Sequence, residues 1–131
     1  MIFLCDYYNQ ASKDLAYSLQ VAGYDATTVV INPDGFLPQG ALSPFTYYVE
    51  AEEETGKPRF FNQVPVPAFW EISGNNQMAR VSNLTEERAR ITYPEGSKAR
   101  IVKSVEWLDK SGKIRQVDHY NKYGFCFAKT T

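Results

Sequence analysis

The sequence predicts an α+β fold, mainly an antiparallel β meander with one helix near the N-terminus. Aromatic residues make up 15% of the 131 residues, with nine Tyr and eight Phe, and broad rings favour the pleated surface of a sheet. After residue 70, turn signals recur at spacings typical of short strands joined by hairpins. A chain of this length is expected to form a single β-rich domain over 1–131, with a strand–helix–strand unit over 1–35 and an antiparallel sheet over 44–131.

The first 35 residues are expected to form the strand–helix–strand unit. Residues 1–5 are an apolar run typical of a strand. Ser12 is a favourable N-cap for a helix over 12–22 that would pack through its leucine face, and Gly23 suits the position after its end. Residues 27–35 combine a β-branched run with an Asn-Pro-Asp-Gly turn signal, so a second strand ends there.

The stretch up to residue 72 is expected to mix short strands with a loop. Residues 45–49 and 59–61 are aromatic and extended, and a charged loop containing Glu52, Glu53 and Glu54 separates them. Residues 64–67 are Val-Pro-Val-Pro, which suits an edge segment because proline cannot donate a hydrogen bond to a ladder. This segment would lead into a strand over 69–72.

Four turn signals divide the remaining chain into an antiparallel meander. The turns are expected at 74–76, 95–97, 110–112 and 122–124. Residues 88–93 alternate, so Ile91 is expected to face the core while Arg88 and Arg90 face out together. In the next strand, around 100–107, Val102 and Val105 would lie on opposite faces. Because neither that strand nor the one over 113–120 has a purely apolar face, we expect a protruding sheet with one side solvated or held for a partner.

The ends of the chain and its cysteines indicate a cytoplasmic protein. Residues 1–5 are too short and lack the basic residues of a signal peptide, and no apolar run reaches the ~18 residues of a membrane span. At most, we expect peripheral association with the inner face of the membrane. Cys5 and Cys126 lie in apolar strand-like runs and are expected to be buried free thiols. The apolar strand over 125–130 stops without a turn, so we expect a longer polypeptide.

The net charge of −1 is unevenly distributed along the chain. Residues 1–79 hold three cations and nine acids, whereas residues 80–131 hold eleven cations and six acids. This asymmetry suits either solvated charges on a sheet or a basic surface that faces a partner. Basic residues interleaved with aromatic ones also occur in sheets that bind single-stranded nucleic acid. A pI of about 5.8 and the absence of an RNA-recognition strand argue against nucleic acid as a partner.

The sequence offers no motif for catalysis, cofactor binding or metal binding. It has no glycine-rich phosphate loop, no nucleophile elbow and no zinc-ligand spacing. His119 follows Asp118, but adjacent strand residues point to opposite faces and cannot readily pair. The run Glu52-Glu53-Glu54 is expected to be solvated. We therefore predict a non-enzymatic protein with no catalytic residue, no metal and no cofactor.

Aromatic pairs are the candidate contact residues. Tyr47-Tyr48, Phe60-Phe61 and Phe69-Trp70 each place one ring on either face of a strand. Both faces are then covered within the domain, or one face is buried only when a partner docks. The residues predicted to make contacts are Tyr47, Tyr48, Phe60, Phe61, Trp70, Trp107 and Tyr120, with Arg88, Arg90, Lys103 and Arg115 as a polar rim.

Three parts of the chain resemble a known family. They are residues 32–38 (Asn-Pro-Asp-Gly-Phe-Leu-Pro) with 43–48, residues 59–72 (from Arg59 through Asn62-Gln63-Val64-Pro65 to Ile72), and residues 105–109 with 118–124. Together they resemble the N-terminal, extended β-sheet region of the stabilising, non-catalytic subunit (GtfB) of the accessory-Sec O-linked N-acetylglucosamine transferase of Gram-positive bacteria. The resemblance covers nearly the whole chain.

The resemblance implies a longer protein with glycosyltransferase-like Rossmann domains after this segment. It implies that the protein pairs with and stabilises a catalytic subunit, through sheets that pack on each other, and helps hold the Ser/Thr-rich acceptor, a serine-rich adhesin, before export. Such an extended chain would bind by strand addition, in which it pairs with the edge of the sheet. The resemblance assigns no contact residue in this chain. Two other functions stay open, a stand-alone carbohydrate-binding module and a single-stranded nucleic-acid-binding module, and so does self-association through the sheet.

Overall fold

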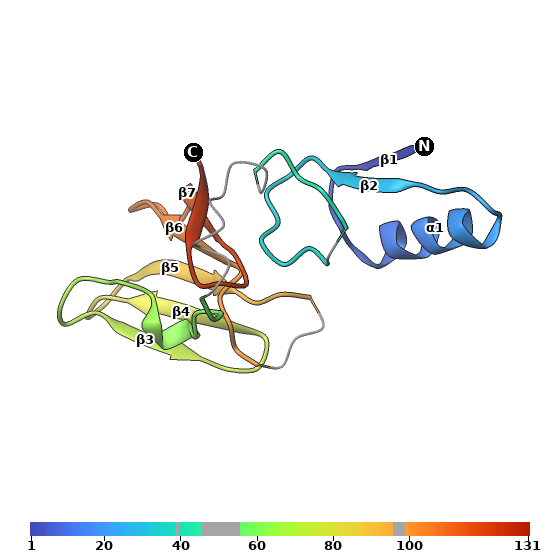
Figure 1. The fold of residues 1–131 in the computed structure, drawn as a ribbon. Coiled ribbons are helices and arrows are strands. Elements are labelled where there is room, and N and C mark those ends of the chain that lie inside the picture. The colour runs from blue at the N-terminus through green and yellow to red at the C-terminus, as the bar shows by residue number, and fades with distance from the viewer. Residues whose placement is uncertain (39, 46–55, 96–98) are drawn as a thin grey trace.

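The computed structural model describes residues 1–38, 40–45, 56–95 and 99–131 (Figure 1). Its elements are β1 (Ile2–Cys5), α1 (Gln10–Val21), β2 (Thr27–Val30), the 3-10 helix η2 (Phe61–Gln63), β3 (Glu71–Gly74), β4 (Met78–Ser82), β5 (Glu87–Thr92), β6 (Ser104–Leu108), β7 (Ile114–Tyr120) and β8 (Cys126–Thr130). One α-helix and a six-stranded antiparallel meander in the described residues confirm the predicted fold class.

The N-terminal unit pairs β1 with β2 in parallel, and α1 connects them. The side chain of Asn9 accepts a hydrogen bond from the Ser12 amide at 3.0 Å, and the Ser12 hydroxyl accepts one from the Asn9 amide at 2.8 Å. Asn9 is therefore the N-cap, and the prediction that Ser12 fills this position is wrong. Ser12 instead completes a capping box from the third helical position. Gly23 follows the helix with a φ of 91°, as expected.

The leucine face of α1 does not pack as predicted. Leu15 is 53% exposed, and Leu19 is only half-buried. Ile2 and Leu4 of β1 are also exposed. Parallel strands normally have both faces covered, so this unit presents apolar surface that the described residues leave open.

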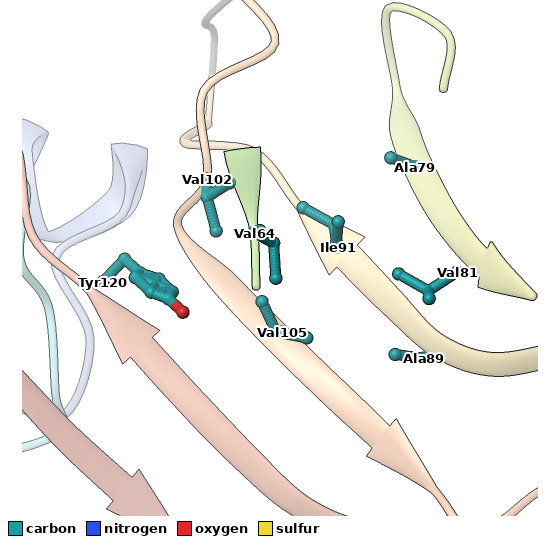
Figure 2. Close-up of a cluster of buried hydrophobic side chains, with 8 residues drawn as sticks. All are labelled: Val64, Ala79, Val81, Ala89, Ile91, Val102, Val105 and Tyr120. Atoms are coloured by element: carbon teal, nitrogen blue, oxygen red, sulfur yellow. The ribbon is translucent and has the colours of Figure 1, made fainter. Parts of the chain in front are cut away.

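The large sheet runs in the order β3-β4-β5-β6-β7-β8, and every neighbouring pair is antiparallel. Paired residues share a face, and one row of pairs links Ala79, Ile91, Val105 and Asp118 across four strands. This row belongs to the core face. The core consists of Val64, Ala79, Val81, Ala89, Ile91, Val102, Val105 and Tyr120 (Figure 2).

Residues 59–70 cover the core face instead of adding a strand. Phe60 makes only an isolated bridge to Ile101, and Phe61 begins η2, so the strand predicted over 59–61 is wrong. The Gln63 side chain accepts from the Phe60 amide at 3.0 Å and closes this turn. Val64 then inserts among Val102, Ile91 and Val105 (Figure 2). The Val-Pro-Val-Pro segment therefore lies over the sheet face, not at its edge.

Backbone geometry explains further departures from the predicted strands. Phe69 has a φ of 72°, so β3 begins at Glu71 and not at residue 69. A bend at Lys103, just before β6, breaks the alternation between Val102 and Val105. Val102 and Val105 are consequently both buried in the core, although opposite faces were predicted.

The turns follow the predictions in part. Those at 74–76, 110–112 and 122–124 join neighbouring strands as expected. A turn over 83–86 was not predicted; it has no glycine, and the Asn83 side chain holds it by accepting from the Glu86 amide at 3.0 Å. The strand over 45–49, the Glu52–Glu54 loop and the turn over 95–97 fall wholly or partly outside the described residues.

The N-terminal unit is joined to the sheet at Gly35. Gly35 forms a parallel bridge with Asn121, and its carbonyl accepts from the Lys122 amide at 2.9 Å. The ammonium of Lys122 also donates to the Leu37 carbonyl at 3.2 Å. Asn121 follows β7, so this joint lies at one end of the sheet. The turns at 83–86 and 109–113 lie at the other end, called the distal end below.

Candidate functional site

Four of the predicted contact residues line one groove at the distal end of the sheet. This tryptophan groove has a volume of about 340 Å³, and its lining consists of Pro67, Trp70, Arg88, Trp107, Leu108, Arg115, Gln116 and Asp118. Aromatic walls with a few polar groups are typical of binding pockets, which start at about 300 Å³. Strands β5, β6 and β7 supply most of the lining, and the segment before β3 supplies Pro67 and Trp70.

Two β-bulges direct arginine side chains to the groove. The register shifts between Val81 and Ser82, where Ser82 pairs with Glu87 and Arg88 is the extra residue. A second shift follows Trp107, where Arg115 is the extra residue on β7. A bulge re-aims a side chain, and bulges are common beside functional sites. Arg88 therefore does not face out beside Arg90, as the alternation predicted, but lies over Trp70.

The guanidinium of Arg88 stacks on Trp70, with its central carbon 5.4 Å from the ring centroid. One terminal nitrogen, Nη1, donates to Glu86 at 3.4 Å. The Nε atom is buried, and no described residue accepts its hydrogen bond. A buried donor without an acceptor is uncommon in proteins.

Trp107 is held in place by a buried carboxylate. Its Nε1 donates to Oδ2 of Asp118 at 3.0 Å, and the Gln116 amide donates to Oδ1 at 2.6 Å. Asp118 is 9% exposed. Both of its oxygens thus already accept hydrogen bonds inside the protein. His119 points to the opposite face, as predicted, where Nε2 lies 2.9 Å from the Thr130 hydroxyl.

The other predicted contact residues lie away from this groove. Arg90 is on the opposite face and pairs with Glu87 at 2.9 Å. Lys103 lines a separate pocket together with Lys13 of α1. Phe61 and Tyr120 pack in or against the core, and Phe60 is 51% exposed. Tyr47 and Tyr48 lie outside the described residues. The basic and aromatic residues of the second half therefore do not form one continuous platform.

Two exposed residues at the distal end were not among the predicted contacts. Phe69 is 92% exposed, and Leu84 in the 83–86 turn is 95% exposed. The pairing of Glu71 with Ser82 brings both residues to this end of the sheet. The aromatic pair Phe69-Trp70 could have marked Phe69 as a candidate contact residue. Nothing in the sequence predicts the positive φ that turns the Phe69 ring outward.

The remaining chemical groups offer little for catalysis. Among the described residues, no three His, Cys, Asp or Glu side chains form a metal-binding group. Cys5 and Cys126 are free thiols, as predicted, but Cys126 is exposed at the edge strand β8, so the expectation that it is buried is wrong. No helix in the described part of the chain is long and apolar enough to cross a membrane.

Comparison with known proteins decides the family. Residues 2–48 match the family model of the GtfB N-terminal domain, and residues 70–131 match that of the GtfB middle domain. The chain belongs to the GtfB family. Its similarity to proteins named UDP-N-acetylglucosamine–peptide N-acetylglucosaminyltransferase stabilizing protein GtfB is 56% identity in Streptococcus gordonii, 47% in Streptococcus agalactiae and 38% in Limosilactobacillus reuteri. Each alignment covers 99% of this chain and 29% of the relative.

Solved structures show the same fold. A chain in the crystal structure of a GtfA/B complex bound to UDP and GlcNAc matches with a TM-score of 0.82 and 56% identity, over 100% of this chain and 29% of that one. A chain of accessory secretory proteins 1, 2 and 3 from Streptococcus pneumoniae has a TM-score of 0.57 at 9% identity, over 95% of this chain and 31% of that one, and shows the fold alone. The chain thus spans under a third of its GtfB relatives.

Proposed function

We propose that this chain is part of a non-catalytic subunit that stabilises a protein O-glycosyltransferase. The subunit pairs with the catalytic subunit in the cytoplasm, free or at the inner face of the membrane, and helps hold a Ser/Thr-rich adhesin while N-acetylglucosamine is added. The observation that carries this proposal is the 56% identity to stabilising proteins along essentially the entire chain. The TM-score of 0.82 to a chain of a GtfA/B complex agrees with it.

The geometry of the sheet suits a binding role. The core face is covered by residues 59–70, whereas the opposite face carries charged and hydroxyl side chains such as Arg80, Arg90 and Thr92. The edge strands β3 and β8 each pair on one side only within the described sheet. A sheet edge of this kind accepts an extended chain by strand addition, which gives affinity with little dependence on sequence.

The experiment that tests this proposal uses the full-length protein and its catalytic subunit. Thermal unfolding of the catalytic subunit and sugar transfer to a Ser/Thr-rich polypeptide are measured with and without this protein. We expect a higher melting temperature and faster transfer when both subunits are present, because a partner that binds only the folded state stabilises it. Sugar transfer by this protein alone, or no effect on the catalytic subunit, would contradict the proposal.

One observation favours a second function, that of a carbohydrate-binding module. Trp70 and Trp107 line a groove with the carboxylate of Asp118 and the amide of Gln116, and indole faces with hydrogen-bonding groups are suited to a sugar ring. Titration of the full-length protein with N-acetylglucosamine oligomers, followed by NMR or calorimetry, tests this function. Binding without any partner would support it.

A further inference from the structure

A second pocket lies where the N-terminal unit meets the large sheet. This junction pocket has a volume of about 260 Å³, and its lining consists of Tyr8, Lys13, Asp34, Phe36, Pro38, Pro94, Glu95 and Lys103. The lining comes from the loop after β1, from α1, from the segment after β2 and from the connection between β5 and β6. The pocket shares no residue with the tryptophan groove, so a ligand bound here would occupy a separate site.

Three hydrogen bonds hold the wall of the pocket that follows β2. The Asp34 carboxylate accepts from the Phe36 amide at 2.9 Å and closes a turn. Lys122 donates to the Gly35 carbonyl through its amide at 2.9 Å and to the Leu37 carbonyl through its ammonium at 3.2 Å. The wall is therefore in place before a ligand arrives, as is usual for small-molecule sites.

Two lysines bring positive charge to the pocket from distant parts of the chain. Lys13 belongs to α1, and its ammonium lies over the Tyr8 ring, 5.3 Å from the ring centroid. The Lys103 amide donates to the Thr92 carbonyl at 2.8 Å, and the Lys103 carbonyl accepts from the Tyr120 amide at 2.9 Å, so two strands fix its backbone. Within the described residues, neither ammonium forms an ion pair. Both charges are thus available to a ligand.

The other lining groups indicate what else the ligand carries. Asp34 is only 9% exposed, and its carboxylate, like that of Glu95, accepts hydrogen bonds from hydroxyl groups. Tyr8 and Phe36 offer ring surface against which apolar carbons can pack. Lysine binds phosphate as a compact charge, whereas arginine is better suited to carboxylates. A ligand that uses all of these groups has one phosphate and several hydroxyl groups on a small carbon ring.

We propose that the junction pocket binds a small phosphate ester that carries hydroxyl groups, such as a hexose phosphate. Lys13 and Lys103 bind the phosphate, and Asp34 and Glu95 accept hydrogen bonds from the hydroxyl groups. The volume of about 260 Å³ is slightly smaller than that of pockets for drug-sized ligands, which begin at about 300 Å³, so the ligand is a small one. Because its contacts come from both parts of the chain, the bound ester also links the N-terminal unit to the sheet.

Calorimetric titration of the full-length protein with glucose 1-phosphate and glucose 6-phosphate tests this site. We expect saturable binding that weakens as salt is added, because salt screens the attraction between ammonium and phosphate. The double variant Lys13→Gln/Lys103→Gln removes both charges and should bind the esters about tenfold more weakly or worse, since hydrogen bonds to charged groups are the stronger ones. Glucose, which lacks the phosphate, and inorganic phosphate, which lacks the ring, should each bind more weakly than the esters.

Lys113→Gln is the matched control, because it removes the same charge at the distal end of the sheet, outside the pocket. It should bind the esters as the unsubstituted protein does. Thermal unfolding of each variant without ligand should differ little from that of the unsubstituted protein, which separates a loss of binding from a loss of stability.

Three results would overturn the inference. The first is that neither ester binds at millimolar concentrations. The second is that the double variant binds them as tightly as the unsubstituted protein. The third is that Lys113→Gln weakens binding as much as the double variant, since the esters would then respond to overall charge. None of these results bears on the proposed function, because pairing with the catalytic subunit is measured separately.

Discussion

Single residues decide where this chain departs from a regular meander. Gly35 can approach the Asn121 backbone only because it lacks a side chain: a Cβ there would lie 2.3 Å from the Asn121 Cα and 2.4 Å from the Tyr120 carbonyl oxygen. At the distal end, Arg88 and Arg115 are the extra residues of the two β-bulges, and both reach the tryptophan groove. Strict alternation would place Arg88 on the opposite face of the sheet. Both cases depend on backbone positions that side-chain chemistry alone does not reveal.

Replacement of Gly35 by alanine is expected to destabilise the protein strongly. The new Cβ would overlap backbone atoms that cannot move away without displacing the β7–β8 turn. We expect a loss on the order of 2–4 kcal/mol in the free energy of unfolding, as for severe overpacking, measured by urea denaturation. Gly112→Ala is the control: its Cβ would meet no atom within 4 Å, so only the positive φ opposes it, at about 1 kcal/mol. Equal losses for both variants would contradict this explanation.

His119 is expected to make stability depend on pH. Burial lowers its pKa, and Lys103 lowers it further, while Asp118 acts in the opposite direction. The folded protein therefore binds fewer protons than the unfolded chain when the pH falls below the ordinary histidine pKa of about 6.5. The contribution of His119 to stability is present above that pH and is lost as the pH falls. Melting temperatures from pH 8 to 5 should decline less in His119→Gln than in the unsubstituted protein.

At the scale of elements, packing of the sheet against residues 59–70 holds the fold together. Ile91 of β5 is completely buried, and Val64 reaches it from the covering segment (Figure 2). The N-terminal helix contributes less to this core, because its leucine face is largely exposed. Stability of the sheet should therefore respond to substitutions in β4, β5 and β6.

Ile91→Ala tests this view of the core. Removing a fully buried isoleucine side chain is expected to cost about 2–5 kcal/mol, because burial is lost and a cavity remains. Ile114→Ala is the matched control on β7, where the side chain is 50% exposed and the cost should stay below about 1 kcal/mol. Urea denaturation of both variants measures the difference. Similar costs at the two positions would show that the sheet face around Ile91 is not the main core.

The sequence predicts the elements better than it predicts their details. Glycine-containing turns at 74–76 and 110–112, and the β-branched run of β2, show where strands begin and end. Register shifts have no such signal, because a bulge is set by how whole strands pair. The α1 N-cap is shifted from Ser12 to Asn9 because both side chains can cap. The groove residues Trp70, Arg88, Trp107 and Arg115 come from the predicted contacts, whereas the exposure of Phe69 and Leu84 depends on turn geometry.

At the scale of the whole molecule, the chain combines a small parallel unit with a larger antiparallel sheet (Figure 1). The parallel unit exposes Ile2, Leu4 and Leu15, and the chain spans 29% of its GtfB relatives. We expect further polypeptide of a longer protein to cover this apolar surface. The sheet, by contrast, has a core of its own.

Size-exclusion chromatography with light scattering measures directly whether the two subunits assemble. The full-length protein is run alone, and then together with its catalytic glycosyltransferase subunit. We expect a stable complex that elutes earlier than either protein and whose mass requires at least one copy of each. Two separate peaks with the masses of the individual proteins, at concentrations well above micromolar, would contradict the claim that this protein is an assembly subunit.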